Sequence, residues 1–515
     1  MGFEDFAREY NKKELTLNAN KYDNSHLSTV EFDLSKIEEA KSTLNEEQTF
    51  LFEDLIRFVN TPECEYYVVA GYAGTGKTYT ISKFVSTITS KVAVTAPTNK
   101  AVKVLADNGD LKGYNIIYST IHKLLALKMV WQPPLHKGGE PRHILVRNLR
   151  AEITINDYSI LILDEASMLS YELFNMINQE KDSKLKVIFM GDPAQIPPVG
   201  EIDSIPLLPE KRAKFNMKFF ELKQIMRQAK DSQILEVAYA IRDNRFKDMD
   251  ALRGIRKTGS NVIFYPNSQK ESFNEVLVEH FLSSSFKEDA NYAKVISWTN
   301  ATVDYYNTLI RERYFNTPNL AKIMKGEKLI ANESIIQEGQ IIFNTSDEFE
   351  VVDYDIRTMN YRAPGRENEP QFQFEGGVSG GLQLKYYKAL VKYGKPVKLQ
   401  INGSVDEEEE NLYIQIDILH EESDGIFKAI LGKLRKYGKD TNQWQPYYQM
   451  MERFASVKYN YAITAHKSQG STYQIVFLIE DDIDKNPKYI ERNRIKYTAS
   501  TRPKLLLNIL SGRNK

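Results

Sequence analysis

The sequence contains a single cysteine and no long apolar run, and both absences narrow the class of protein. Cys64 is the only cysteine, so the chain cannot form an internal disulfide and suits a reducing compartment. No apolar stretch approaches the ~18–20 residues that a bilayer crossing needs. The segment Met1–Tyr10 carries Glu4, Asp5 and Glu9, so it lacks the basic start and apolar centre of a signal peptide. We therefore expect neither secretion nor membrane spanning.

The sequence also lacks an excess of charge of either sign. Its 68 lysine and arginine residues nearly balance 69 aspartate and glutamate residues, which gives a formal net charge of -1. A protein that coats itself in nucleic acid usually has a large basic excess, so that class is excluded, while binding in one basic groove is not. With 515 residues, 42% of them hydrophobic and 27% charged, the composition is globular and fits roughly three or four domains.

Short apolar segments alternate with longer amphipathic stretches in two parts of the chain. Segments of this length suit strands buried on both faces of a parallel sheet, and their alternation with helices is typical of doubly wound α/β domains. The first set is Tyr66–Ala70, Val92–Ala96, Ser159–Leu163 and Val187–Met190, and the second is Lys294–Trp298, Ile475–Ile479 and Leu505–Leu510. We therefore predict two α/β domains.

The stretch between Lys325 and Met450 has a different pattern. The segment Ile335–Tyr354 predicts a strand, a turn and a strand, and Lys395–Ile401 and Asn411–Leu419 predict further strands. Glycines at 376, 377, 380 and 381 indicate a loop, and we interpret the acidic residues 406–410 as a solvated turn. We predict a β-rich insertion that interrupts the second α/β domain.

A glycine-rich segment, Gly71–Thr78, follows the predicted strand Tyr66–Ala70 and leads into the predicted helix Tyr79–Ile88. Glycines allow the backbone to curl so that successive N–H groups point at phosphate oxygens, and the helix N-terminus adds favourable charge. In this pattern Lys77 would reach the β- and γ-phosphates and the Thr78 hydroxyl would hold Mg²⁺. The alternative is a glycine-rich turn without a ligand.

Two carboxylates, Asp164 and Glu165, directly follow the predicted strand Ser159–Leu163. The mouth of a parallel sheet is where a Mg²⁺-binding acid is expected, so Asp164 would join the metal shell and Glu165 would polarise the attacking water. An exposed acidic loop would look the same in isolation. Because the pair follows the phosphate loop in chain order, we predict a site that hydrolyses nucleoside triphosphates.

The order of these motifs resembles that of superfamily 1 helicases, and most closely that of group B, the RecD-like and phage Dda-like DNA helicases. The resemblance covers most of the chain from Leu44 onward, and the order is more diagnostic than any one motif. The further matching segments are Leu44–Gln48 (Q motif), Ala96–Ala101 (motif Ia), Ser119–His122 (the next strand-binding motif), Gly191–Pro198 (motif III), Leu222–Gln228 (motif IV), Thr464–Thr472 (motif V) and Tyr497–Arg502 (motif VI).

The resemblance implies ATP and Mg²⁺ as cofactors, bound between the two α/β domains. Gln48 would read the adenine edge, Gln195 would sense the γ-phosphate, and Arg227 and Arg502 would be the arginine fingers. A cation that stabilises the transition state only when two domains close couples hydrolysis to motion. The implied catalytic residues are Lys77, Glu165, Gln195, Arg227 and Arg502; the nucleotide contacts are Gln48, Gly74, Thr75, Gly76, Lys77, Thr78 and Gly470; and the metal ligands are Thr78 and Asp164.

The strand-binding motifs consist mainly of short polar side chains near predicted strand ends. Such side chains contact phosphate and sugar without reading the base sequence, although the same residues commonly cap the following helix. Trp298 could stack on a base or close the core. The implied DNA contacts are Pro97, Thr98, Asn99, Thr120, His122, Trp298, Asn300, Thr464, His466, Lys467 and Ser468.

We expect an α/β fold with two RecA-like domains, a small hairpin insertion that acts as a strand-separating pin, and an SH3-like β-rich insertion. The hairpin turn is placed at His136–Glu140, flanked by Trp131. The expected limits are 1–43 for an N-terminal extension, 44–225 for the first RecA-like domain with the pin at 126–156, 226–324 plus 451–515 for the second, and 325–450 for the β-rich insertion.

The expected function is ATP-dependent translocation on single-stranded DNA with unwinding of duplex DNA, in replication, recombination or repair. The 5′-to-3′ direction rests on the resemblance alone. Two alternatives stay open: an RNA or RNA–DNA helicase, and a DNA-stimulated ATPase that loads or recruits other proteins without unwinding. We expect a cytoplasmic monomer, in the host cytoplasm if a bacteriophage encodes it, with a single-strand-binding or replisome protein as a further partner.

Overall fold

A computed structural model gives the fold of the chain. It describes residues 30–107, 115–134, 136, 139, 141–226, 232–243, 261–318, 320–337, 340–361, 382–394 and 412–511. Within these ranges, none of the helices combines the length and the apolar character that a bilayer crossing requires.

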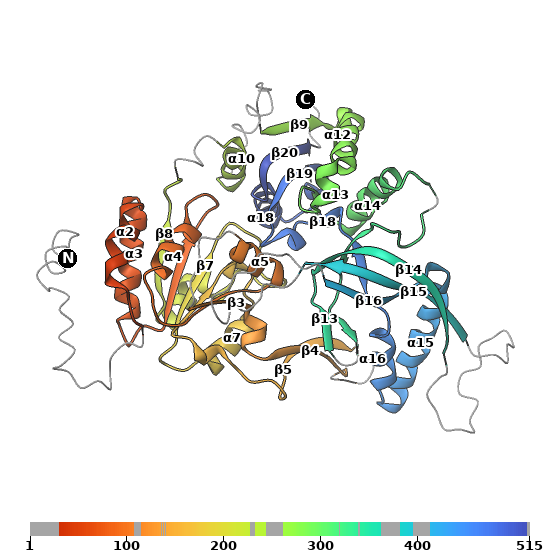
Figure 1. Ribbon diagram of the computed structural model, residues 1–515, viewed down its shortest axis with the longest axis horizontal. Coiled ribbons are helices and arrows are strands. Elements are labelled where there is room, and N and C mark those ends of the chain that lie inside the picture. Colours follow the sequence, from red (N-terminus) through yellow and green to blue (C-terminus); the bar gives the residue numbers. More distant parts are fainter. Residues whose placement is uncertain are drawn as a thin grey trace, which may run out of the picture.

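The first domain is built on a parallel sheet with strand order β3-β2-β6-β7-β1-β8 (Figure 1). The strands are β1 (Tyr66–Gly71), β2 (Val92–Ala96), β3 (Ile116–Thr120), β6 (Ile160–Leu163), β7 (Lys186–Gly191) and β8 (Lys218–Leu222). Alternate residues of β1 enter two separate cores. Tyr67 and Val69 pack with α3 (Glu46–Val59), α4 (Lys77–Val85) and α5 (Asn99–Asp107), while Tyr66 and Val68 pack with α7 (Tyr171–Glu180). Helices therefore cover both faces.

The second domain repeats this plan with strand order β18-β10-β19-β20-β9, also parallel. The strands are β9 (Val262–Pro266), β10 (Ala293–Ser297), β18 (Ala462–Thr464), β19 (Tyr473–Ile479) and β20 (Pro503–Ser511). Helices α10 (Gln233–Arg242) and α18 (Tyr489–Ser500) pack on one face, and α12 (Lys270–Leu282) and α14 (Asn300–Tyr314) on the other. The predicted fold class, α/β with two RecA-like domains, is confirmed.

Residues 328–459 contain an antiparallel sheet with strand order β16-β15-β14-β11-β17. Its strands are β11 (Lys328–Ala331), β14 (Glu348–Tyr361), β15 (Leu382–Tyr393), β16 (Leu412–Leu419) and β17 (Val457–Tyr459), and a hairpin of β12 (Ile335–Gln337) and β13 (Gln340–Phe343) lies beside it. Two helices, α15 (Asp424–Thr441) and α16 (Gln445–Met451), follow β16. The predicted strand Lys395–Ile401, the glycine loop at 376–381 and the acidic residues 406–410 lie outside the described residues.

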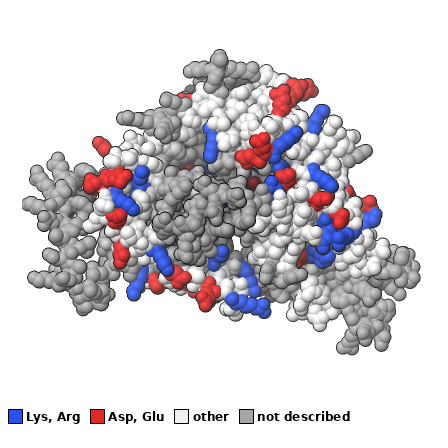
Figure 2. All heavy atoms as spheres, viewed as in Figure 1, with Lys and Arg blue, Asp and Glu red and all other residues white. Residues whose placement is uncertain are grey.

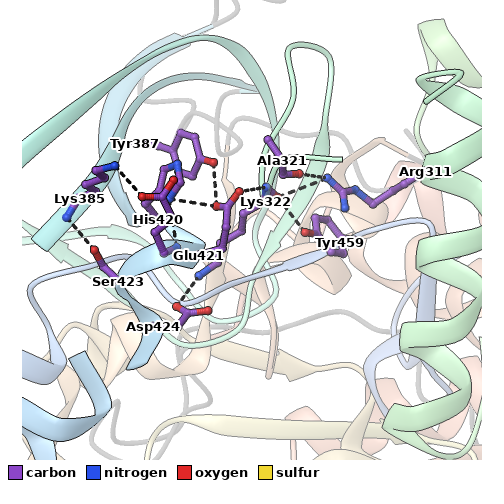
Figure 3. Close-up of polar contacts among 11 residues, drawn as sticks. Arg311, Ala321, Lys322, Lys385, Tyr387, His420, Glu421, Ser423, Asp424 and Tyr459 are labelled. Carbon is purple, nitrogen blue, oxygen red and sulfur yellow. Dashed lines mark hydrogen bonds and ion pairs between the residues drawn. The ribbon is translucent and has the colours of Figure 1, made fainter. Parts of the chain in front are cut away.

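A network of charged and aromatic side chains joins this insertion to the second domain (Figure 3). Arg311 of α14 forms a buried ion pair with Glu327, at 2.8 Å from Nη2 to Oε2. Glu421 accepts hydrogen bonds from the Lys322 backbone N–H (3.2 Å) and from the Tyr387 hydroxyl (2.8 Å). Because the Arg311 pair is buried, the root of the insertion is fixed to α14.

A second, smaller insertion leaves the first domain as an antiparallel hairpin of β4 (Leu127–Gln132) and β5 (Arg142–Arg147). It falls where the pin is predicted. Of the predicted turn at 136–140, only residues 136 and 139 are described, so the tip of the hairpin stays a prediction.

Part of the predicted N-terminal extension packs on the first domain. The side chains of Val30 and Ile37 are buried in the core that also contains α4. Phe32 forms an antiparallel bridge with Ile88, and this explains why α4 ends at Val85 instead of continuing to Ile88 as predicted. The predicted limits of the domains remain predictions.

Candidate functional site

The phosphate loop, Gly71–Thr78, joins β1 to α4 at the carboxyl edge of the first sheet. Gly74 and Gly76 have φ values of 79° and 81°, in the left-handed region that glycine tolerates, and so the loop curls. Because α4 begins at Lys77, the backbone N–H groups of its first turn face this loop. The Lys77 ammonium group donates to the Gly71 carbonyl oxygen at 2.5 Å. Phosphate oxygens could replace that acceptor.

Asp164 and Glu165 follow β6 at the same edge of the sheet. Glu165 has φ 51°, a strained value for a residue with a side chain, and its N–H donates to Asp164 Oδ1 at 2.8 Å. Burial raises the pKa of Asp164, against the opposing charge of Lys77. Burial also raises the pKa of Glu165, to about 7, although Arg502 opposes the shift. Both carboxyls therefore lie within electrostatic reach of the phosphate loop.

The predicted metal ligands, Thr78 and Asp164, offer one hydroxyl and one carboxylate. Within the described parts of the chain, no three His, Cys, Asp or Glu side chains come together as a metal site. Mg²⁺ typically keeps several waters and binds through one or two carboxylates plus substrate phosphates. This donor set fits a metal ion that arrives with the nucleotide.

A hydrogen-bonded chain crosses from the first domain to the second beside these carboxylates. When the Gln195 amide is oriented to satisfy its neighbours, its Nε2 donates to Glu165 Oε2 at 3.2 Å and its Oε1 accepts from Arg502 Nη2 at 3.3 Å. Arg502 is only 6% exposed, and its Nε donates to the Thr498 carbonyl at 2.9 Å. The structure thus brings three of the predicted catalytic residues together from two domains.

The pKa of Glu165 predicts how ATP hydrolysis depends on pH. A carboxylate that polarises water must be ionised, so the rate falls as the pH drops through its pKa. Since that pKa is about 7, we expect kcat/KM for ATP to decrease about tenfold per pH unit below pH 7. Steady-state ATPase assays between about pH 5.5 and 8.5 measure this limb. An identical limb in Glu165→Gln would assign the titration to another group.

Gln48 is buried directly beneath the phosphate loop. Its Nε2 lies 3.4 Å from the Thr75 carbonyl oxygen and 3.0 Å from Met226 Sδ, while its Oε1 accepts from the Asn45 backbone N–H at 3.2 Å. A Cβ at Gly76 would come within 2.4 Å of Nε2, so glycine is required there. The amide is engaged at both ends by the protein, and an adenine contact would have to replace one of these bonds.

Of the two remaining predicted nucleotide-site residues, one is not described and the other contacts the first domain away from the phosphate loop. Arg227 lies outside the described residues. Gly470 has φ 67°, and a Cβ there would come within 2.8 Å of Ala101 Cβ and 3.7 Å of Thr98 Oγ1. The missing side chain therefore lets the segment after β18 approach α5, beside the predicted DNA contacts of the first domain and not the phosphate loop.

The predicted DNA contacts of the first domain gather at the ends of β2 and β3, which are neighbouring parallel strands. Thr98 and Thr120 each accept a backbone hydrogen bond from the start of the following helix, at 3.2 and 3.3 Å, so both cap a helix N-terminus. Burial lowers the pKa of His122, which faces the Pro97 carbonyl. Asn99 begins α5 between them. Neutral donors of this kind suit phosphate and sugar.

The predicted contacts of the second domain follow β10 and β18, which are also neighbours. Trp298 packs, partly buried, against the core, as its alternative interpretation requires. Ser468 is buried and donates to the Ala465 carbonyl at 2.7 Å, so its hydroxyl faces the interior. The others at these two strand ends are Asn300, Thr464, His466 and Lys467. Figure 2 shows acidic and basic side chains interspersed on one face of the molecule, as the balanced charge predicts.

The sequence does not reveal a junction at which the first domain, the insertion and the second domain meet. Lys100 of α5 forms an ion pair with Glu348 of β14 at 2.6 Å and donates to the Tyr473 hydroxyl of β19 at 3.1 Å. Burial would raise the pKa of Glu348, but the Lys100 charge lowers it to about 2. Asn99 donates to Asp347 at 3.2 Å. Lys100 lies in motif Ia, yet nothing in the sequence indicates an insertion residue as its partner.

The sequence also does not predict that two tyrosines of the second domain contact the phosphate loop. The hydroxyl groups of Tyr497, on α18, and Tyr239, on α10, contact the backbone of Ala73 in the phosphate loop. Tyr497 lies inside the motif VI segment, which could have drawn attention to it. Tyr239 lies in none of the matching motif segments, so the sequence does not single it out.

Aromatic side chains hold the β4–β5 hairpin against the insertion. Trp131 of β4 stacks on Tyr448 of α16, with ring centroids 5.5 Å apart and planes 4° apart. It also meets Tyr447 edge-on at 6.4 Å, and Tyr448 in turn lies against Trp444 at 6.3 Å. The predicted pin is thus attached to a helix of the other domain's insertion.

Comparison with known proteins gives two family matches. The family described as "AAA domain" matches residues 43–260, which include the phosphate loop, the carboxylate pair and Gln195. The family described as "UvrD-like helicase C-terminal domain" matches residues 459–510, which include Arg502.

Similar whole proteins include the ATP-dependent DNA helicase dda of Enterobacteria phage T4, which is 23% identical over 80% of this chain and 87% of its own length. An uncharacterised protein of Acanthamoeba polyphaga mimivirus is 26% identical over 89% and 98%. Among solved structures, a Pif1 helicase from Bacteroides in complex with ADP-AlF3 and ssDNA aligns over 91% of this chain and 93% of that one, with 16% identity and a TM-score of 0.44. The resemblance to superfamily 1 group B helicases that the motifs indicate is confirmed by these similarities.

Proposed function

We propose that the chain is an ATP-dependent DNA helicase that translocates 5′ to 3′ on single-stranded DNA. The observation that supports this most strongly is the chain Glu165–Gln195–Arg502, which connects the acidic edge of the first domain to a buried arginine of the second. The curated relatives support ATP-dependent helicase activity. The polarity rests on the likeness to group B.

In the proposed cycle, ATP binds at the phosphate loop, and Thr78 and Asp164 would hold the Mg²⁺ ion that neutralises phosphate charge. Arg502 then reaches the nucleotide from the second domain, and the release of phosphate after hydrolysis removes the charge that holds it there. The predicted DNA contacts lie at the ends of β-strands in both sheets. Each closure and opening of the domains therefore changes the distance between two binding sites on one DNA strand. That change of spacing moves the protein along DNA.

We further propose that the β4–β5 hairpin splits the duplex while α16 holds it in place. A wedge can use the force of translocation only if it is anchored, and the stack of Trp131 on Tyr448 provides an anchor outside the hairpin itself. An aromatic pair contributes about 0.5–1.5 kcal/mol beyond its buried area.

Trp131→Ala should therefore separate unwinding from ATP hydrolysis. We expect the unwinding rate of a forked duplex to fall about tenfold, because the wedge loses its anchor. The rate of DNA-stimulated ATP hydrolysis should stay within about twofold, since the nucleotide site is untouched. Met129→Ala is a matched control, because Met129 lies on the same strand and is 43% exposed. Equal losses in both assays would contradict the anchoring role.

The proposed function is tested by ATP hydrolysis with and without single-stranded DNA, together with unwinding of duplexes that carry a tail at one end. Stimulation by DNA and unwinding from the 5′ tail only would establish the motor and its direction. Stimulation by oligo-dT without unwinding would favour the loader or recruitment factor. Stimulation by poly-U but not by poly-dT would favour the RNA helicase.

A further inference from the structure

The Tyr497 hydroxyl connects three elements of the nucleotide site. It accepts a hydrogen bond from the Ala73 backbone N–H at 3.1 Å and donates one to Asp192 Oδ2 at 2.7 Å. Ala73 belongs to the phosphate loop and Asp192 directly follows β7, while Tyr497 lies on α18 of the second domain. Tyr497 is 1% exposed and Asp192 is 2% exposed, so water does not compete for either bond.

A second tyrosine holds the same loop residue from the other side. The Tyr239 hydroxyl, on α10, donates to the Ala73 carbonyl oxygen. The guanidinium group of Arg242, one turn further along α10, lies over the rings of Tyr239 and Tyr72, at 4.6 and 4.1 Å. Ala73 is therefore bound through both its N–H and its C=O to side chains of the second domain.

The Tyr497 bond engages a backbone N–H group of the loop that is proposed to bind the nucleotide. The N–H groups of a phosphate loop work by turning toward phosphate oxygens, and Ala73 immediately precedes Gly74, where the loop curls. Its N–H cannot serve a phosphate and the Tyr497 hydroxyl together. Tyr497 also lies on the helix that leads directly to Arg502, so a change at its hydroxyl is passed to the proposed arginine finger through α18.

We propose that Tyr497 is a nucleotide-sensing positioning residue, whose hydroxyl holds Ala73 and releases it when phosphates bind at the loop. The release loosens α18 from the first domain at the moment when Arg502 must reorient toward the nucleotide. Tyr239 supports the same state through the Ala73 carbonyl. This inference rests on the proposed function and adds to it the contact by which the second domain detects the nucleotide.

The test is equilibrium binding of ADP to the full chain, measured calorimetrically with and without oligo-dT, for wild type and Tyr497→Phe. Removing the hydroxyl removes a bond that competes with the nucleotide, so the Kd for ADP should fall about three- to tenfold. The ratio of the Kd values without and with oligo-dT measures the coupling of the two sites, and it should move toward one. Tyr239→Phe should change both quantities in the same direction.

Tyr461→Phe is the matched control. Tyr461 is also fully buried in the second domain and donates to a carboxylate, Glu327 Oε1, at 2.9 Å, but it lies away from the phosphate loop. It should lower the Tm as Tyr497→Phe does, while the Kd for ADP and its response to oligo-dT stay at wild-type values. A Kd that is unchanged or higher in Tyr497→Phe would overturn the proposal. Wild-type protein that binds no ADP would instead refute the proposed function.

Discussion

Replacing Arg502 by alanine is expected to lower kcat for ATP hydrolysis by about 10³–10⁵, the range that arginine fingers contribute in related phosphoryl-transfer systems. Arg502 is buried, and through Gln195 it is connected to Glu165, the residue proposed to polarise the attacking water. We expect its charge to stabilise the transition state more than the bound ground state. The Kd for ADP should consequently change little, while kcat for ATP hydrolysis falls strongly. Single-turnover hydrolysis with saturating oligo-dT measures the loss.

Arg494→Ala provides the control, on the helix that immediately precedes Arg502. Arg494 pairs with Asp203 of the first domain at 2.9 Å, and both side chains are about one-fifth exposed. A partly exposed pair of this kind contributes about 0–1 kcal/mol, so kcat should stay near the wild-type value. If Arg494→Ala were as damaging as Arg502→Ala, contact between the domains in general would explain the loss, and no arginine finger would be needed.

Replacing Lys77 by alanine should lower ATP hydrolysis by at least about 10²–10³, the cost of removing one preorganised group that stabilises transition-state charge. Lys77 is the cation of the phosphate loop, and its ammonium group is held at the mouth of the loop by the Gly71 carbonyl. Binding of single-stranded DNA should persist, since the predicted DNA contacts lie elsewhere. ATPase assays and fluorescence anisotropy of labelled oligo-dT measure the two properties.

Lys83→Ala is the companion variant, because Lys83 lies on the same helix as Lys77. Its ammonium group lies over the ring of Tyr79. It should leave hydrolysis within about twofold of wild type. Turnover of ATP by Lys77→Ala at the parental rate would show that the nucleotide site has been assigned to the wrong loop.

The local parts of the nucleotide site can be predicted from the sequence because strand, turn and helix are encoded within a few residues. Gly71–Thr78 follows a strand that is buried along its whole length, and the Asp164–Glu165 pair follows another. Both therefore lie at the carboxyl edge of one parallel sheet once the strand pattern is recognised. Helix ends are harder to place, since Ile88, predicted at the end of α4, instead pairs with Phe32, which lies 56 positions earlier in the sequence.

Contacts between the domains have no comparable signal in the local sequence. From the sequence alone, a tyrosine in motif VI could equally lie in the core of its own domain. A tryptophan on a short hairpin could equally lie on the surface. Their partners are chosen by tertiary packing across long separations in sequence. The contacts of this kind are Tyr497 with Ala73, Trp131 with Tyr448, Lys100 with Glu348, and Gly470 with Ala101.

We expect the junction of Lys100, Glu348 and Tyr473 to limit how the domains move relative to each other. The Lys100 and Glu348 side chains are 17% and 19% exposed, and the Tyr473 hydroxyl bonds to the same ammonium group, so we expect this junction to stay closed while nucleotides exchange. In the proposed cycle, the two domains would then rotate about this junction. The phosphate loop lies three strands away, about 14 Å at the usual strand spacing, whereas the strand ends beside α5 lie next to the junction. A large movement at the nucleotide would thus produce a smaller movement of the DNA contacts, which would act with a larger force.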